Sequence, residues 1–362
     1  MNTATPVEVR TLRSAAGGGL PAWLVNLGLT LLLVVAWFVN APLHANLDPY
    51  FLDVLIRIGV AIILAVSLNL INGITGQFSL GHAGFMALGA YTCGILMRHT
   101  FDTNTCTQGF AQIAAFLGAT LLAGLIAAIA GLLIGVPALR LRGDYLAIAT
   151  LGFAEIIVII LNKIEWLGQP NTGWLVGGSA GLHNIPVITT FFWTFTWCVI
   201  CIVCIWRLVN SGKGRAFLAV REDEIAAAAT GIDTTYHKVA AFVVGAFFAG
   251  VAGALSATWS GNLAPASFNF TRSVEVVVMV VLGGSGSITG AILAAVVLTW
   301  LPEQLRFLES WRMVIYSLIL ILMMILRPEG LLGNRELWWT RKRISTASKP
   351  NSTLTGSPDA TA

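Results

Sequence analysis

Five polar side chains gather around a glycine-rich interruption in an otherwise apolar part of the chain. The stretch 67–94 reads SLNLINGITGQFSLGHAGFMALGAYTCG and contains Asn69, Asn72, Gln77, Ser79 and His82. Amides, hydroxyls and an imidazole can contact a polar solute, and polar backbone at membrane depth persists only where it is buried in protein or lines a water-filled cavity. The alternative is a tight hairpin outside the membrane, in which the glycines only make the turn. The spacing leaves both interpretations open.

A second interruption has the same character. Residues 282–290, LGGSGSITG, join two short apolar segments and include Ser285. These glycines do not make a nucleotide-binding loop, because that motif requires G-x-x-x-x-G-K-[ST], which occurs nowhere in the chain. We therefore expect this chain not to bind ATP itself. Two interruptions, each followed by a helix of small residues, suggest an internal repeat of the kind that transporters show, in an orientation that the sequence leaves open.

Ionisable groups are rare inside the apolar segments. Glu155 lies near the middle of its segment, whereas Arg57 and Glu275 lie nearer the ends of theirs. A charge at mid-helix costs about 2.5–3.5 kcal/mol on insertion scales, so Glu155 is a candidate pathway residue. A structural hydrogen bond is at least as good an explanation.

No pattern in the sequence indicates a metal or catalytic centre. Cys198, Cys201 and Cys204 lie on one face of an apolar helix, where cysteine packs as a small hydrophobic residue. The five histidines fall in separate segments without an H-E-x-x-H spacing. We expect no catalytic residues, no metal and no cofactor in this chain, and no enzymatic activity.

The polar loop 211–238, SGKGRAFLAVREDEIAAAATGIDTTYHK, contains a helix-forming run. Glu222 and Glu224 favour the N-terminal end of a helix, and Ala226 and Ala227 help to propagate it. Gly231 is placed for a left-handed C-terminal cap. A short helix beneath a membrane bundle is a natural docking element for a cytoplasmic partner; the alternative is a surface helix that contacts nothing.

The composition identifies the elements that must position these residues. The chain has 362 residues, 56% of them hydrophobic and 10% charged, with a mean hydropathy of +0.81. Average soluble proteins are about 25% charged, so a soluble enzyme, a nucleic-acid-binding protein and a disordered scaffold are all excluded. A helix needs about 20 apolar residues to cross a bilayer. We therefore predict an all-α polytopic membrane protein with about ten spans, some short or discontinuous: 22–40, 51–71, 79–97, 110–139, 145–167, 187–209, 239–260, 273–282, 288–301 and 311–326.

Lysine and arginine are concentrated in alternate loops, which predicts that both termini are cytoplasmic. The basic pI of about 8.9 reflects these loops and does not indicate nucleic-acid binding. We divide the chain into a cytoplasmic tail (1–20), a membrane domain (21–330, including the loop 211–238) and a basic, then disordered, cytoplasmic tail (331–362).

Several of these stretches resemble one family. The loop segment REDEIAAAATGI is similar to a relaxed form of the coupling-loop signature of ABC-importer permeases, with Glu224, Ala226, Ala227 and Gly231 as the nearest matches. SLNLINGITGQFSLGHAGFMALGAY resembles a signature of permeases in branched-chain amino-acid importers, of the LivM type. PALRLRGDYLAIATLGFAEI, GGSAGL at 177–182 and RPEGLLG at 327–333 look familiar from the same family. The similarity extends over about residues 50 to 333.

The resemblance implies one permease subunit of an ATP-driven importer in the plasma (inner) membrane. A second permease would complete the pathway, two cytoplasmic ATPases would drive it, and an external binding protein would deliver Leu, Ile or Val. The coupling helix, about 221–231, would sit in a cleft of an ATPase. This assigns coupling to Arg221, Glu222, Glu224, Ala226, Ala227 and Gly231.

Two other functions remain open. Related urea-importer permeases share the SLGH-type motif, so urea or another small solute is an alternative substrate. A gradient-driven secondary transporter is the less favoured alternative, with Glu155 and His82 as proton sites. The docking-type loop and the lack of a carboxylate cluster argue against it.

Overall fold

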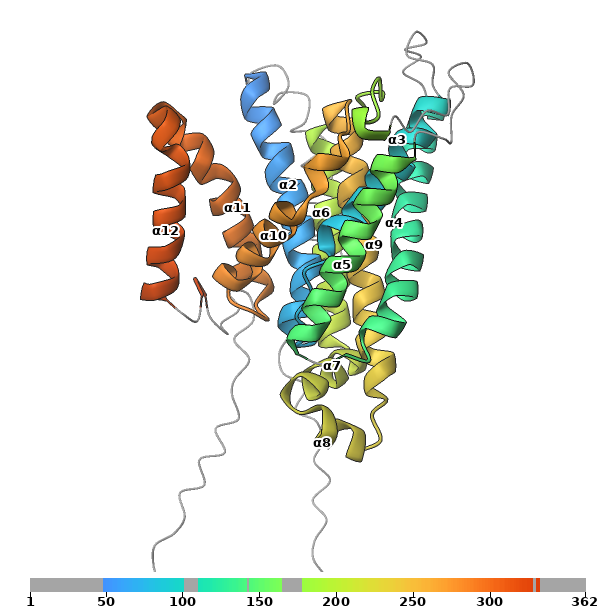
Figure 1. The fold of residues 1–362 in the computed structure, drawn as a ribbon, viewed down its shortest axis with the longest axis vertical. Coiled ribbons are helices and arrows are strands. Elements are labelled where there is room, and N and C mark those ends of the chain that lie inside the picture. Colours follow the sequence, from blue (N-terminus) through green and yellow to red (C-terminus); the bar gives the residue numbers. More distant parts are fainter. Residues whose placement is uncertain (1–47, 101–109, 142, 165–177, 328–329, 333–362) are drawn as a thin grey trace, which may run out of the picture.

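The computed structural model describes residues 48–100, 110–141, 143–164, 178–327 and 330–332. In this part the chain is a bundle of helices (Figure 1). The main helices are α2 (Pro49–Asn69), α3 (His82–Thr100), α4 (Phe110–Ala138), α5 (Asp144–Lys163), α6 (Phe191–Asn210), α7 (Gly212–Glu222), α8 (Glu224–Ala229), α9 (Thr234–Ser260), α10 (Phe270–Gly283), α11 (Ile288–Gln304) and α12 (Arg312–Leu326). Shorter turns are η1 (Leu70–Ile74), η2 (Gly178–Ala180), η3 (Pro265–Phe268) and η4 (Leu305–Trp311).

The prediction of an all-α polytopic membrane protein is confirmed. Seven helices in the described residues are long and apolar enough to cross a membrane. Nine of the ten predicted segments overlap a helix, and the first, 22–40, lies outside the described residues. The helix α3 is not among the seven, although it is buried along much of its length. A helix enclosed by other helices does not need large apolar side chains facing lipid, so hydropathy underestimates it.

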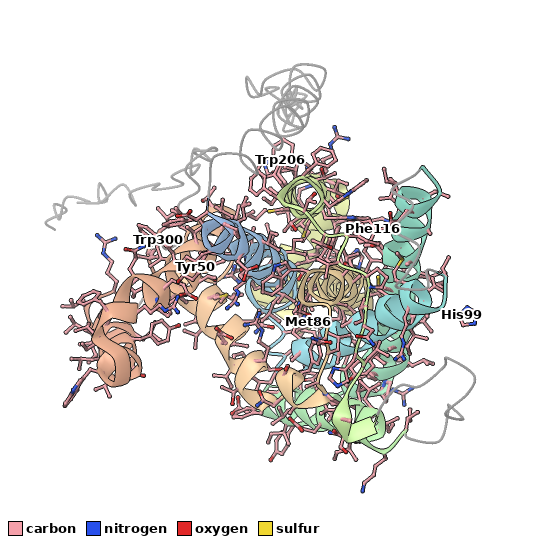
Figure 2. All side chains as sticks on the ribbon, turned by 90° about the horizontal axis from the view of Figure 1, so that it is seen from above. Tyr50, Met86, His99, Phe116, Trp206 and Trp300 are labelled. Carbon is pink, nitrogen blue, oxygen red and sulfur yellow. The ribbon has the colours of Figure 1, made fainter. Side chains whose placement is uncertain are left out.

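The helix α9 forms the middle of the bundle and packs along α3 and α4 (Figure 2). Glycine permits this close approach. A methyl group on Gly253 would collide with the carbonyl oxygen of Met86 in α3, and one on Gly250 would lie 2.5 Å from Cβ of Ala127 in α4. Small residues on α9 therefore serve close packing against α3 and α4.

Large apolar side chains point outward from the helices at the edge of the bundle. Leu133 in α4, Ile148 in α5 and Ile325 in α12 are each at least 65% exposed. Such surfaces are unusual on soluble proteins and suit hydrocarbon or another membrane subunit. In Figure 2, α12 lies at one edge of the bundle and α4 at the opposite edge.

The short helices α7 and α8 lie beyond one end of the bundle (Figure 1). They lie between α6 and α9, so the loop predicted at 211–238 is mostly helical. Ser211 caps α7 by accepting a hydrogen bond from the backbone N–H of Gly214, and Asp233 caps α9 through Tyr236. Both ends of the loop are thereby fixed to long helices.

Candidate coupling and pathway residues

The chain bends back between α2 and α3 through an irregular buried segment, residues 72–81, which we call the first break. It begins within the π-helical turn η1 (Leu70–Ile74). Thr75, which ends this turn, donates from both its backbone N–H and its hydroxyl to the carbonyl of Leu70, at 3.1 and 2.8 Å. π-turns occur frequently at functional sites. Asn72 closes the segment, since its side chain accepts from the N–H of Ser79 and donates to the same residue's carbonyl.

Most of the first break is buried in protein. Thr75, Gln77 and Ser79 are each no more than 4% exposed, whereas Gly76 lies at the surface. The backbone N–H of Leu80 donates to the hydroxyl of Thr150 in α5 at 3.1 Å. This burial favours a break held inside the protein over a hairpin in water. The side-chain amide of Gln77 has no partner in the described residues, so we expect water or another subunit to supply one.

His82 begins α3 and is fully enclosed. Its Nε2 lies 2.8 Å from the hydroxyl of Ser67, which itself donates to the carbonyl of Leu64. The direction of the bond between the Ser67 hydroxyl and the ring nitrogen depends on the tautomer of His82. His82 thus joins α2 to α3, although the sequence alone does not identify Ser67 as its partner.

The second break, residues 284–287, separates α10 from α11. Ser287 is buried and caps α11, because its hydroxyl accepts from the N–H of Gly290 at 3.0 Å. Ser285, the predicted candidate, is exposed and lies on the outer side of the turn. After α12 the chain returns to this place, where the N–H of Leu331 donates to the carbonyl of Leu282 at 2.7 Å.

Asn69 ties the two breaks together. Its Oδ1 accepts from the N–H of Gly286 at 2.9 Å, and its Nδ2 donates to the carbonyl of Ser287 at 3.1 Å. Gly73 lies so close to Gly286 that a methyl group on it would collide with the Gly286 nitrogen. Two segments more than 200 residues apart in the chain are therefore one packed unit, which the sequence does not reveal.

Two caps shape the loop at 211–238. Asp223 ends α7 and starts α8, with its Oδ1 accepting from the N–H groups of Ile225 and Ala226 at 2.8 and 3.1 Å. Gly231 ends α8 with φ +84°. Its N–H donates to the carbonyl of Ala228, and the next N–H, of Ile232, donates to Ala227, which is the Schellman arrangement. The predicted helix is present as α8, with Glu224 in its first turn and the glycine cap after its end, whereas Arg221 and Glu222, predicted at its start, belong to the last turn of α7.

The six predicted coupling residues do not share one face. Glu222 and Ala226 are exposed, whereas Ala227 is buried and Glu224 forms a 2.7 Å ion pair with Lys238 in α9. Four exposed side chains form the outer surface of α8: Ile225, which is 72% exposed, Ala226, Ala228 and Ala229. Of these, the prediction from sequence named only Ala226. We call these four residues the α8 surface. Arg221 instead lies against both breaks.

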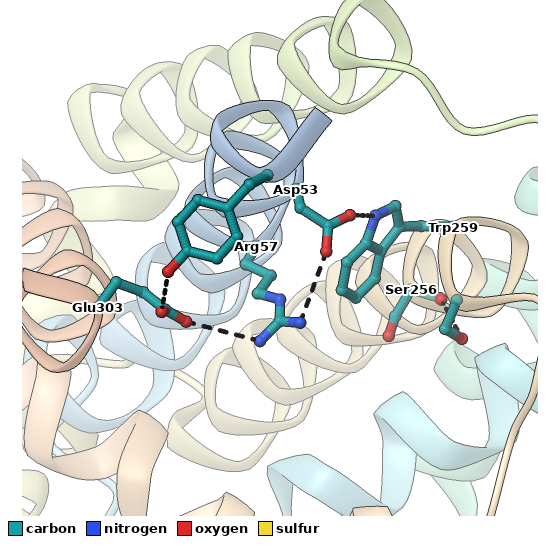
Figure 3. A network of polar contacts seen from close by, with 7 residues as sticks. Asp53, Arg57, Ser256, Trp259 and Glu303 are labelled. Carbon is teal, nitrogen blue, oxygen red and sulfur yellow. Dashed lines mark hydrogen bonds and ion pairs between the residues drawn. The ribbon is translucent and has the colours of Figure 1, made fainter. Parts of the chain in front are cut away.

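A separate polar cluster lies at the other end of α9 (Figure 3). Arg57 in α2 pairs with Asp53 at 3.6 Å and with Glu303 in α11 at 3.9 Å, and it covers the ring of Trp259. The indole of Trp259 donates to Asp53 at 2.8 Å, and the hydroxyl of Tyr50 donates to Glu303. α9 has 27 residues, or about 40 Å at 1.5 Å per residue, so this cluster and the loop lie a membrane's thickness apart.

The remaining candidates have ordinary surroundings. Glu275 pairs with Arg272 at 2.6 Å. Glu155 is half-buried on α5, more than one turn beyond Thr150. Cys198 and Cys201 are buried and unpaired, which agrees with packing, while Cys204 is exposed.

The sequence comparisons identify the family. Residues 50–326 match the family described as the permease component of branched-chain amino acid transport systems. This chain belongs to that family. The LivM permease protein of Salmonella typhimurium is 39% identical over 301 residues, which cover 75% of this chain and 68% of the relative. The LivM protein of Escherichia coli is 37% identical over 330 residues, covering 83% and 73%.

A second type of relative is more distant. The LivH permease protein of Salmonella typhimurium is 27% identical over 289 residues, which cover 76% of this chain and 92% of the relative. No solved structure matches the chain significantly. The family match and the two LivM relatives confirm the resemblance to LivM-type permeases. Together with the seven membrane-length apolar helices in the described residues, they make the chain a multi-pass inner-membrane transport permease.

Proposed function

We propose that this chain is one of two permease subunits of an ATP-driven importer of branched-chain amino acids. Curated relatives of this chain bear the names LivM and LivH, and both names describe high-affinity branched-chain amino acid transport. This likeness to two kinds of permease supports a heteromeric pathway. The expected partners are the second permease, two cytoplasmic ATPases and an external binding protein that delivers the substrate.

The α8 surface is the observation that carries the coupling assignment. Four side chains, Ile225 and three alanines, face outward from a capped helix beyond the end of the bundle. Burying an isoleucine against a partner stabilises an interface by about 1.5–3 kcal/mol. The helix is anchored to α9 by Lys238 and to α7 by Asp223, so a force on α8 is transmitted to the membrane helices.

The distribution of charge supports an orientation in which this loop and both termini are cytoplasmic. The loop carries Lys213, Arg215, Arg221 and Lys238. Lysine and arginine are retained on the cytoplasmic side of membrane proteins. The cluster of Arg57, Asp53 and Glu303 then faces the external side, where the binding protein is expected.

Transport would proceed by alternating access. Closure of the ATPase pair would move α8 and α7, and with them the helices that meet at the two breaks. A bundle with two packings is switched by such a movement, because packed interfaces change in discrete steps. Each branched-chain amino acid carries one ammonium, one carboxylate and an apolar side chain, so the pathway must pass both kinds of group.

Affinity purification from solubilised membranes tests the assignment. We expect the wild-type chain to retain a second permease and ATPase subunits, Ile225→Glu to lose the ATPases, and Ile225→Ala to retain them more weakly. A charge at the centre of an apolar contact lacks a partner, whereas alanine only shortens the contact. A wild-type chain that purifies without ATPase, or equal ATPase recovery with Ile225→Glu, contradicts the assignment.

The alternatives predict other results. A gradient-driven transporter would carry substrate in vesicles that contain this chain alone. A urea importer would show urea uptake, unaffected by excess leucine, in the assembled complex.

A further inference from the structure

The side chain of Arg221 fills the space between the two breaks. Arg221 lies in the last turn of α7 and is half-buried. A methyl group built on Gly76 would lie 3.0 Å from its Cγ, and one built on Gly286 would lie 2.6 Å from its Nη1. The aliphatic stem therefore lies against the first break and the guanidinium against the second.

Both contacts depend on glycine. Gly76 has φ +72° and Gly286 has φ +96°, a region that residues with a Cβ rarely adopt. The missing side chains leave the volume that Arg221 occupies. One arginine of the cytoplasmic loop thus contacts both places where the membrane helices are interrupted.

Arg221 meets the breaks near helix ends of both signs. The α2–η1 helix ends at Ile74 and α10 ends at Gly283, whereas α11 begins at Ile288, two residues after Gly286. Helix C-termini carry a partial negative charge and N-termini a partial positive one, so these terminal charges oppose each other near the guanidinium. The contact that the distances establish is steric, between the Arg221 side chain and the two glycines.

We propose that Arg221 is a positioning residue through which the loop sets the position of the two breaks. It lies two residues before Asp223, the cap that begins α8, so displacement of α8 displaces Arg221. Asn69 binds the second break to α2, so both breaks follow together. The inference rests on the proposed function for its source of movement, but the contact itself belongs to this chain alone.

Two variants separate this role from a general need for basic residues. Arg221→Ala removes the stem and the charge, and Arg221→Lys restores most of both. Arg215→Ala is the matched control, because Arg215 is an exposed arginine on the same helix. In purified wild-type and variant chains, hydrogen exchange of the backbone at 73–77 and 284–287 reports the contact without any partner.

We expect Arg221→Ala to speed exchange in both breaks, with Arg221→Lys intermediate and Arg215→Ala at the wild-type rate. In the reconstituted importer we expect Arg221→Ala to retain its ATPases and ATP hydrolysis while leucine uptake per ATP falls. Mutations between coupled sites change the coupling by roughly 2- to 30-fold, so a fall of at least about twofold is expected. The lysine variant should recover part of this loss.

Several results would overturn all or part of the inference. Unchanged exchange in both breaks refutes the contact, unchanged uptake per ATP refutes the coupling role, and an equal loss in Arg215→Ala shows a non-specific charge effect. Loss of ATPase binding by Arg221→Ala also contradicts it, because that result makes Arg221 a docking residue. A wild-type chain without ATPases refutes the proposed function and the coupling role, while faster exchange in Arg221→Ala would still support the contact.

Discussion

Replacing Asn69 with alanine should loosen the second break, although Asn69 belongs to α2. The side chain makes two hydrogen bonds across the junction, to the N–H of Gly286 and the carbonyl of Ser287. Asn69 is fully buried and Ser287 is 1% exposed, so water cannot easily replace these bonds. Alanine leaves the N–H of Gly286 without its partner, while the carbonyl of Ser287 keeps the bond it accepts from the N–H of Ala291 at 3.1 Å.

The magnitude follows from the burial. The unpaired N–H of Gly286 costs about 1–3 kcal/mol, and because Gly286 is only half-buried, a total near 1–2 kcal/mol is expected. Asn72→Ala is the matched control. Asn72 also bonds one N–H and one carbonyl, but both belong to Ser79 within the first break, and Asn72 is half-buried. Its loss should remain local to the first break.

Two assays separate the variants. Intrinsic fluorescence of the 12 tryptophans follows thermal unfolding in detergent, and hydrogen exchange reports on each break. We expect Asn69→Ala to melt lower than the wild type and to exchange faster at 284–287, where Asn72→Ala should match the wild type. Wild-type exchange at 284–287 in Asn69→Ala refutes the view that the two breaks form one unit.

Further substitutions test the packing and the loop. Gly253→Ala should lower the melting temperature, because the new methyl group collides with the carbonyl of Met86 and overpacking costs about 1–3 kcal/mol. The control Gly152→Ala, with open space around the new methyl group, should be neutral or stabilising. Equal melting temperatures of the two variants would contradict this packing. Asp223→Ala should cost α8 about 0.5–2 kcal/mol and speed its exchange without changing bundle melting; unchanged α8 exchange counts against the cap. Gly231→Ala meets no neighbour but forces a left-handed residue, so a loss of about 1–2 kcal/mol confined to the loop is expected, and wild-type loop exchange argues against it.

The helices were predictable because the relevant signal is local. Apolar runs, three of them shorter than a bilayer crossing, locate nine helices in the described residues. Asp223, Glu224 and Gly231 mark the ends of α8 through caps that involve only near neighbours. The two breaks were found in the same way, since glycine and polar residues interrupt the apolar pattern within a few positions.

The contacts between these elements were not predictable. Periodicity along a helix does not say which other segment a side chain meets, so neither the bonds of Asn69 to the second break nor the position of Arg221 follows from spacing. The outward face of α8 is set by the ion pair of Glu224 with Lys238 and by burial of Ala227. Two residues that match the family's coupling-loop signature, Glu224 and Ala227, therefore stabilise the loop and do not belong to its exposed surface.

Uptake of labelled leucine by proteoliposomes is the most direct test of the central claim. The complex of this chain, its second permease and the ATPases is reconstituted, supplied with the external binding protein, and compared with vesicles that contain this chain alone. We predict uptake by the complex that requires both ATP and the binding protein, and none by the chain alone. Leucine uptake by the single chain, driven by an ion gradient and indifferent to ATP, would contradict the account.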